Sequence, residues 1–317
     1  MRDAGALDAA PTDLVSDLLY RLKPRGKSLI VTVFGDALQP HGGGAWLGGL
    51  IQILGPMGLS ERVVRSSVFR LVRDELLSAT QTGRRSFYAL TSTGKRQFQA
   101  AAQRIYAVRD TRWDGAWTQA WLSNRLPEAE RDSLRQELSW RGFAPLGPNL
   151  LVHAGAILET TEQTINRLGL NGRVSVLITD DSNASSAHAI AQALVKETWP
   201  LDSLAKQYQA FMRAFEPVRA AMQNPGDLDP ASCFALRSLL IHDYRRAVLR
   251  DPMLPADLLN SDWPGLRAAA LARDLYRLLV WPSQAHITGA LEARDGVFSP
   301  PAQDFNDRFG GLPYAES

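Results

Sequence analysis

Apolar residues recur along the N-terminal third of the chain at spacings that predict a run of helices and one hairpin. After Thr12, which suits a helix N-cap, Leu14, Leu18 and Leu22 follow one another every four residues, as on one face of a helix. The further elements predicted are helices at 28–38, 46–54, 61–75 and 91–106, a glycine-rich loop at 41–44, and strands at 77–81 and 86–90 around Gly83. Three helices and a hairpin predict a winged helix-turn-helix domain at 28–108, preceded by an arm at 1–27.

The middle of the chain alternates strand-like and helix-like segments. The predicted strands lie at 117–122, 143–146, 150–153 and 174–179, and the predicted helices at 128–141 and 160–168. Their order, βαββαβ, predicts a ferredoxin-like central domain at 109–185. Helical periodicity then predicts a helical domain at 186–298, followed by a flexible or loosely docked tail at 299–317. The expected fold class is therefore α+β, in several domains.

Length and composition are typical of a multidomain globular protein. The chain has 317 residues, of which 45% are hydrophobic and 21% charged. No apolar stretch approaches the roughly 20 residues that span a bilayer, and residues 1–11 do not resemble a secretory signal. The single cysteine, Cys233, excludes an internal disulfide and a cysteine cluster for zinc or iron-sulfur. These features predict a cytoplasmic protein.

Positive charge is concentrated in one segment of a chain whose formal net charge is only +2. At about 100° per residue, the helix predicted at 61–75 places Val64, Val68 and Leu71 on one side. The candidate DNA-binding residues are Arg62, Arg65, Ser66, Arg70 and Arg73 on the remaining surface of that helix, and Arg84 and Arg85 at the hairpin tip. Guanidinium groups match phosphates and guanine edges, so the segment predicts a helix for the major groove and a wing for the backbone or minor groove. For the helix alone, an ordinary solvated face is the alternative, and the hairpin arginines favour DNA.

Motifs that would indicate an enzyme are incomplete. The run 26–28, Gly-Lys-Ser, ends like a phosphate-binding loop, but Arg21 stands where the leading glycine should be and no strand precedes it. Ser203 and Lys206 form Ser-x-x-Lys without the other motifs of that chemistry. The five histidines are scattered singly without zinc-ligand spacing. A ribonuclease metal would need a carboxylate at the end of the first strand of the central domain, but residues 117–124 carry none and Asp114 lies before the strand. We therefore expect no catalytic residue, no metal and no enzymatic activity.

Longer motifs spread over most of the chain invite comparison with known families. They are Ser28-Leu-Ile-Val-Thr-Val-Phe-Gly-Asp36, Trp46-Leu-Gly48, Leu59 to Val72, Gly83-Arg-Arg-Ser-Phe-Tyr88, Trp113-Asp-Gly115, Leu138 to Phe143, His242-Asp-Tyr-Arg-Arg246 and Asp251-Pro-Met-Leu-Pro255. From 28 to about 279 the chain closely resembles the PaaX family of phenylacetate-degradation transcriptional repressors. The resemblance implies a GntR-like winged helix, a central domain similar to the small CRISPR-associated ribonuclease fold, and a helical C-terminal domain. It also implies a repressor of a catabolic operon that releases DNA when phenylacetyl-coenzyme A binds, with no cofactor.

The effector that the resemblance implies needs cationic groups for its phosphates and an aromatic wall for its acyl group. The candidate effector-binding residues are His242, Tyr244, Arg245, Arg246 and Arg250, because arginine forks suit phosphates and aromatic rings suit an aryl group. The alternative is that these arginines form ordinary intrahelical pairs with Asp243 and Asp251.

The expected assembly is a homodimer on double-stranded operator DNA. One short recognition helix reads few base pairs, so a two-fold dimer on a palindromic operator is expected to double the specificity. The alternative function, from a different class, is a protein-interaction module whose winged helix docks protein. In that case the helix and hairpin arginines should be replaceable without loss of duplex binding.

Overall fold

The computed structural model describes residues 11–108, 112–180, 187–222, 229–291 and 299–313. The chain divides into two compact units. The first unit comprises 1–108, 209–246 and 268–317, and the second comprises 109–208 and 247–267. The arm predicted at 1–27 is described from residue 11, where the first helix begins.

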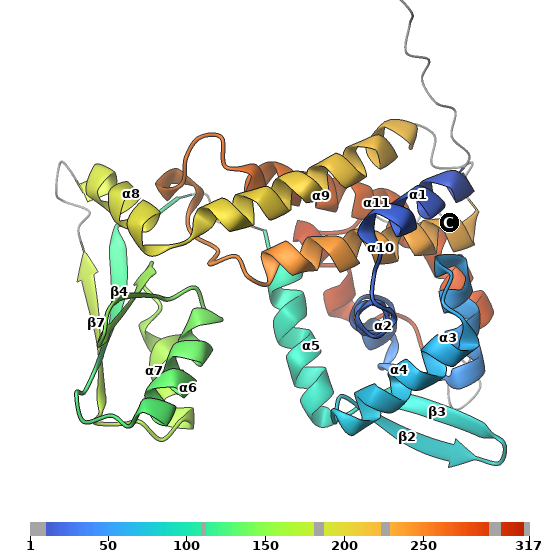
Figure 1. Cartoon of the computed structure of the whole chain (residues 1–317), viewed down its shortest axis with the longest axis horizontal. Helices are drawn as coiled ribbons and strands as arrows, with labels where there is room; N and C mark the ends of the chain where they lie inside the picture. The colour runs from blue at the N-terminus through green and yellow to red at the C-terminus, as the bar shows by residue number, and fades with distance from the viewer. Residues whose placement is uncertain (1–10, 109–111, 181–186, 223–228, 292–298, 314–317) are drawn as a thin grey trace, which may run out of the picture. The chain divides into compact units, whose positions relative to one another are not determined.

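The N-terminal part of the first unit combines helices with a small sheet (Figure 1). The helices are α1 (Pro11–Leu22), α2 (Gly26–Val33), α3 (Leu47–Leu54), α4 (Glu61–Arg73) and α5 (Ser92–Ile105). The strands are β1 (Gly44–Trp46), β2 (Leu77–Thr82) and β3 (Arg85–Leu90), in the antiparallel order β1-β3-β2. Shorter helical segments are a π-helix (Phe34–Leu38) and two 3₁₀ turns (Gln39–His41 and Gly55–Met57). The core is built from the apolar faces of α2, α3 and α4, where Ile30, Ile53 and Val64 are buried.

Three local details differ from the sequence-based expectation. The loop predicted at 41–44 leads into the short strand β1, which starts at Gly44 and pairs with β3. A Cβ on Gly44 would lie 2.6 Å from the ring of Phe87, so glycine permits this close pairing. The helix predicted at 28–38 begins at Gly26 and passes into the π-helix before residue 38. Thr91, rather than Ser92 or Thr93, caps α5 and accepts a hydrogen bond from the Gly94 N–H at 2.9 Å.

The C-terminal part of the first unit consists of three long helices that the boundary between the units divides. They are α9 (Leu201–Ala221), α10 (Pro230–Val248) and α11 (Pro264–Ala290), of which 209–221, 230–246 and 268–290 belong to this unit. From Ser232 to His242 every residue of α10 is buried. A helix that is buried on all sides forms the centre of its unit rather than a surface.

The segment 299–313 is fixed in the first unit. It forms two 3₁₀ turns (Gln303–Phe305 and Arg308–Gly310), and Phe305, Arg308 and Phe309 are all buried. The Phe309 N–H donates to the Tyr106 carbonyl at 3.0 Å. The expectation of a flexible or loosely docked tail is therefore wrong for these residues, because two aromatic rings and a guanidinium find partners far away in the sequence.

The second unit is built on a four-stranded antiparallel sheet (Figure 1). Its elements follow the chain as β4 (Ala116–Leu122), α6 (Glu128–Ser139), β5 (Ala144–Gly147), β6 (Leu150–Ala154), α7 (Leu158–Arg167) and β7 (Val174–Asp180), in the sheet order β5-β6-β4-β7. Leu134 and Leu138 of α6 and Ile165 of α7 form one hydrophobic cluster with Ala120 and Leu151 of the sheet. Both helices therefore cover the same face of the sheet.

The rest of the second unit is helical. It includes α8 (Ala187–Thr198), the first part of α9 and a 3₁₀ turn at Ala256–Leu258. Asp257 in that turn accepts two hydrogen bonds of 3.0 Å from the Trp113 N–H, and its carbonyl accepts one of 2.9 Å from Gln192 of α8. Across the parts of both units that the structure describes, no helix combines the length and hydropathy that crossing a membrane requires.

Candidate nucleic-acid interface

The orientation of α4 is fixed by its cap and by its apolar side. The Ser60 side chain accepts a hydrogen bond from the Val63 N–H at 3.4 Å and starts the helix. Val64, Val68 and Leu71 are fully buried, so this side faces the core of the first unit. The remaining surface of α4 must therefore face outward.

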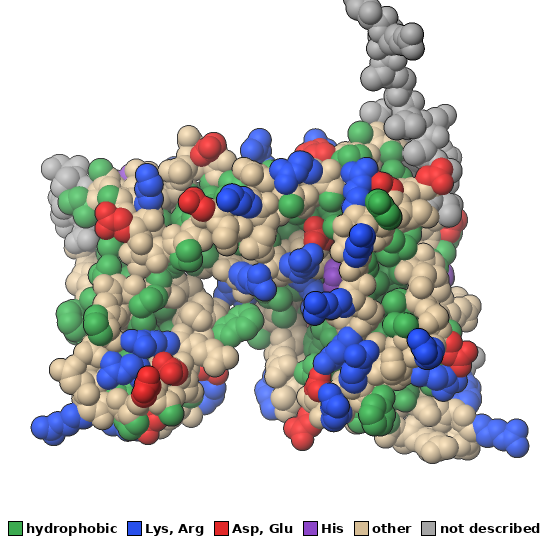
Figure 2. Space-filling model, in the orientation of Figure 1, with side chains coloured by type: hydrophobic (Ala, Val, Ile, Leu, Met, Phe, Trp, Pro, Cys, Tyr) green, Lys and Arg blue, Asp and Glu red, His purple; other side chains and the backbone are tan. Residues whose placement is uncertain are grey.

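The outward surface of α4 carries all five of the helix residues predicted to bind DNA. They are exposed without exception: Arg62, Arg65, Ser66, Arg70 and Arg73. Figure 2 shows Lys and Arg side chains gathered over α4 and at the end of the hairpin formed by β2 and β3. We call the exposed residues of α4, from Arg62 to Arg73, the α4 face.

The arginines of the α4 face differ in how firmly the protein holds them. Arg65 pairs with Glu61 one turn earlier (Nη2 to Oε1, 2.7 Å), and Arg70 donates to the Ser66 carbonyl at 3.2 Å. Within the described residues, no hydrogen bond or ion pair holds Arg62 or Arg73. These two guanidinium groups retain their full hydrogen-bonding capacity for an anionic ligand.

The hairpin presents two further cations at its tip. Gly83 has a φ of +59°, a conformation that suits glycine at the tight turn between β2 and β3. Arg84 and Arg85 are exposed, as predicted. The Arg85 guanidinium stacks over the ring of Trp46, 4.3 Å from its centroid, and Trp46 in turn packs edge-on against Phe87. Arg85 is thus held against the sheet.

Two sets of contacts connect α4 to the C-terminal helices through α2. A Cβ on Gly26 of α2 would lie 2.6 Å from Val63 of α4, so the two helices approach closely there. From α10, Arg245 donates to both the carbonyl and the hydroxyl of Ser28 in α2, at 3.0 and 2.9 Å. His242 of α10 lies 3.0 Å from the Thr32 hydroxyl through Nδ1. A shift of α10 would therefore displace α2, and through α2 it would displace α4.

A buried ionic cluster, which the sequence did not reveal, joins the π-helix to α10, α11 and the C-terminal segment. Asp36 accepts hydrogen bonds from Tyr106, Tyr276 and Arg308 at 2.6, 2.9 and 3.0 Å. Its second carboxylate oxygen forms an ion pair with Arg237 (Nε to Oδ2, 2.8 Å). Burial alone would raise the pKa of Asp36, but Arg237 and Arg308 outweigh it and hold that pKa below its usual value. The carboxylate is therefore charged and faces two buried cations.

The predicted effector-binding residues are not gathered on one open surface. His242 and Tyr244 are buried, and the Tyr244 ring packs against Phe211 with centroids 5.4 Å apart. Burial, followed by the charges of Arg245 and Arg246, lowers the pKa of His242 to about 4, so the imidazole is neutral. Arg246 is exposed and pairs with Asp243 at 3.2 Å, which matches the alternative of an intrahelical pair.

Arg250, the fifth of these residues, belongs to the second unit. It is exposed and lines a small hollow of about 190 Å³ together with Trp199, Gln207 and Pro252. Asp251 accepts a hydrogen bond of 2.6 Å from the buried Tyr208 hydroxyl.

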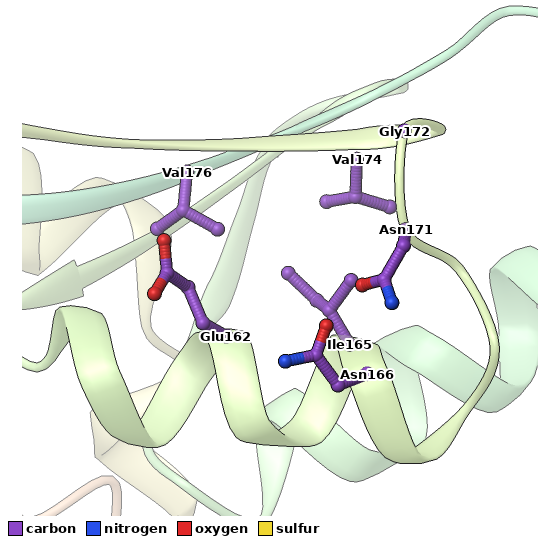
Figure 3. Close-up of a pocket in the computed structure, with 7 residues that line it drawn as sticks. All are labelled: Glu162, Ile165, Asn166, Asn171, Gly172, Val174 and Val176. Carbon is purple, nitrogen blue, oxygen red and sulfur yellow. The ribbon is translucent and has the colours of Figure 1, made fainter.

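A second hollow of the same unit, of about 300 Å³, lies between α7 and β7 (Figure 3). Glu162 and Asn166 reach into it from α7, and Asn171 from the loop that follows, opposite Val174 and Val176. None of the residues predicted to bind the effector lines it.

Residues of the incomplete enzyme motifs make contacts that stabilise the fold. The Gly-Lys-Ser run at 26–28 opens α2, and Lys27 forms an ion pair with Asp74. Asp114, just before β4, accepts hydrogen bonds from the Ala116 and Ala156 N–H groups at 2.9 and 3.0 Å. In the described portion of the chain, no three His, Cys, Asp or Glu side chains are grouped to hold a metal ion.

Comparisons with known proteins cover almost the whole chain. Three family models match consecutive segments: the PaaX-like protein at 25–94, the PaaX protein central Cas2-like domain at 110–191 and the PaaX-like protein C-terminal domain at 199–289. The chain is 34% identical over 288 residues to the transcriptional repressor PaaX of Escherichia coli (strain K12), which covers 90% of each protein. In fold it is similar to the uncharacterized protein Rv0674 from Mycobacterium tuberculosis, with a TM-score of 0.53 and 21% identity over 82% of this chain and 98% of that chain.

The fold and these matches define a mixed α+β protein with a Cas2-like central domain and a helical C-terminal region. The chain belongs to the PaaX family, which confirms the resemblance seen in its sequence motifs.

Proposed function

We propose that this chain is a DNA-binding transcriptional repressor that places α4 in the major groove and the β2–β3 hairpin along the backbone or minor groove. In this proposal residues 28–108 act as a winged helix-turn-helix and 109–185 as a ferredoxin-like domain. The observation that carries it is the α4 face, whose arginines are exposed because the opposite side of the helix is locked in the core.

The dimensions of α4 suit a groove. Its 13 residues rise about 20 Å at about 1.5 Å per residue, and an α-helix fits the roughly 12 Å width of the major groove. Arg62 and Arg73, near its two ends, are free to contact phosphates or guanine edges, while Arg84 extends the cationic surface to the hairpin tip.

We place the protein in the cytoplasm, where the proposed target is an operon for phenylacetate catabolism. A homodimer is proposed to bind it on an inverted repeat. The proposed inducer is an acyl-coenzyme A thioester, phenylacetyl-coenzyme A by family resemblance, and the relative from Escherichia coli is a transcriptional repressor. The contacts of His242 and Arg245 with α2 support a route from the helical region to α4. A ligand can shift the operator affinity only by its differential affinity for two forms, typically about 1–3 kcal/mol, or roughly 5- to 150-fold.

A protein-docking winged helix is the second candidate function. The observation that favours it is Phe69, a large apolar side chain exposed on α4, which also suits a protein partner. Replacing the α4 and hairpin arginines separates the two candidates. Loss of DNA binding favours the repressor, and unchanged DNA binding favours the protein-docking module.

A gel-shift titration against the duplex upstream of the chain's own coding region tests the proposal. We expect tighter binding to this duplex than to a scrambled one, and a 5- to 150-fold weakening by phenylacetyl-coenzyme A but not by free coenzyme A. We also expect a footprint with dyad symmetry on the duplex, and a dimer in sedimentation experiments. Equal affinity for the upstream and scrambled duplexes would contradict sequence-specific repression, and no response to the thioester would remove the inducer from the proposal.

A further inference from the structure

Phe69 is a large apolar side chain that α4 exposes rather than buries, and it belongs to the α4 face. Its side chain is 68% exposed, whereas the adjacent Val68 is fully buried. On a helix, Phe69 neighbours Ser66 and Arg65, one turn before it, and Arg73, one turn after it. It therefore lies in the middle of the α4 face and not at the margin of the core.

An exposed phenylalanine at this position indicates a surface that binds a partner molecule. Removing such a ring from water is favourable, and the folded chain forgoes this gain at Phe69 while it buries the adjacent Val68. Figure 2 shows hydrophobic surface next to Lys and Arg side chains over α4. A matching partner must offer a small apolar spot surrounded by negative charge.

The major groove of DNA has this combination of features. Its phosphates line both edges, and the C5 methyl group of thymine is the apolar group that it exposes, a contact to which phenylalanine is suited. Arg62 and Arg73 are eleven residues apart, about 16 Å along the helix axis, and Phe69 lies between them. With the two arginines at phosphates or guanine edges, the ring in between would face the base edges.

We infer that Phe69 reads a thymine by packing on its C5 methyl group, and that it is a specificity-determining residue of the operator complex. This inference rests on the proposed DNA-binding function and adds a base preference to it. The arginines supply attraction to any duplex, since phosphates carry no sequence information. The apolar contact discriminates, because only thymine presents a methyl group in that groove.

The test replaces each thymine of the footprinted duplex by uracil, one at a time, which removes the methyl group and leaves base pairing unchanged. At one thymine in each half-site we expect about a 4-fold loss of affinity, the equivalent of about 0.8 kcal/mol for one buried methyl-sized group. Phe69→Ala should bind the thymine duplex more weakly than the parent and should no longer distinguish thymine from uracil.

Two further variants serve as controls. Arg62→Ala should bind every duplex more weakly while keeping the thymine-to-uracil ratio of the parent. Tyr20→Ala, which removes a similarly exposed aromatic ring from α1, should leave both affinity and ratio unchanged. A parent chain that binds the duplex but is indifferent to every replacement would overturn the inference about Phe69 and leave the proposed function intact, as would a Phe69→Ala variant that keeps the ratio. Failure of the parent to bind any duplex would overturn both.

Discussion

Replacing Asp36 by Asn removes the one negative charge from a buried cluster that contains two arginines. Arg237 and Arg308 both contact this carboxylate and are themselves buried. Loss of one partner from a buried ion pair typically costs about 3–5 kcal/mol, because the remaining charge stays desolvated. For a unit of 150–250 residues this corresponds to a fall in Tm of roughly 6 to 20 °C.

Thermal and urea unfolding at pH 7, followed by circular dichroism, measure this loss. Asp17→Asn is the matched control, because it makes the same substitution in the exposed Asp17–Arg21 pair and should cost about 1 kcal/mol or less. In the double variant Asp36→Asn with Arg308→Met, one of the uncompensated cations is gone, so the combined loss should be smaller than the sum of the single losses. If Asp36→Asn costs no more than Asp17→Asn, the cluster does not hold the C-terminal segment in place and the reasoning fails.

Two more predictions concern α10. Because the pKa of His242 is about 4 in the folded protein and about 6.5 in the unfolded chain, the unfolded chain binds more protons between these pH values. His242 should therefore contribute a fall in stability of up to about 3 kcal/mol as the pH drops from about 6.5 to about 4. The pKa values of His41, His153 and His286 are also lowered, so His242→Gln should reduce the pH dependence measured in urea titrations without abolishing it. A parent and a variant with identical pH profiles would show that another group is responsible. Arg245→Ala, which breaks two hydrogen bonds to Ser28, should lower the free energy of unfolding by about 1.5–3 kcal/mol, whereas Arg246→Ala should change it by less than about 1 kcal/mol. Equal losses in the two variants would mean that Arg245 does not anchor α2.

The parts of the fold that depend on local pattern could be predicted from the sequence. The four-residue spacing of apolar side chains located α4 within two residues and assigned Val64 and Val68 to the core. The exposed arginines of the α4 face follow from the same periodicity. Phe69 was missed, although a large apolar residue on the polar side of the predicted helix was a visible signal.

The parts that depend on contacts between distant segments could not be predicted. Asp36 meets Arg237 and Arg308 across 201 and 272 residues, and no local pattern marks such partners. The sequence predicts a flexible or loosely docked segment at 299–313, because the segment is rich in glycine and proline. Nothing in this local pattern indicates that two of its aromatic residues are buried. Side-chain chemistry alone predicts the effector-binding residues, but residues adjacent in sequence on a helix point to different neighbours.

The salt dependence of duplex binding by an Arg62→Ala and Arg73→Ala double variant tests most directly whether the α4 face binds DNA. Each phosphate contact contributes about −0.9 to the slope of log affinity against log salt, so the slope of the double variant should be smaller in magnitude than that of the parent by about 1.8. The control is Arg21→Ala with Arg219→Ala, which removes the same charge from exposed ion pairs on α1 and α9 and should leave the slope unchanged. A folded Arg62 and Arg73 double variant with the slope and affinity of the parent would contradict the assignment of DNA binding to α4. So would a control pair that reduces the magnitude of the slope equally.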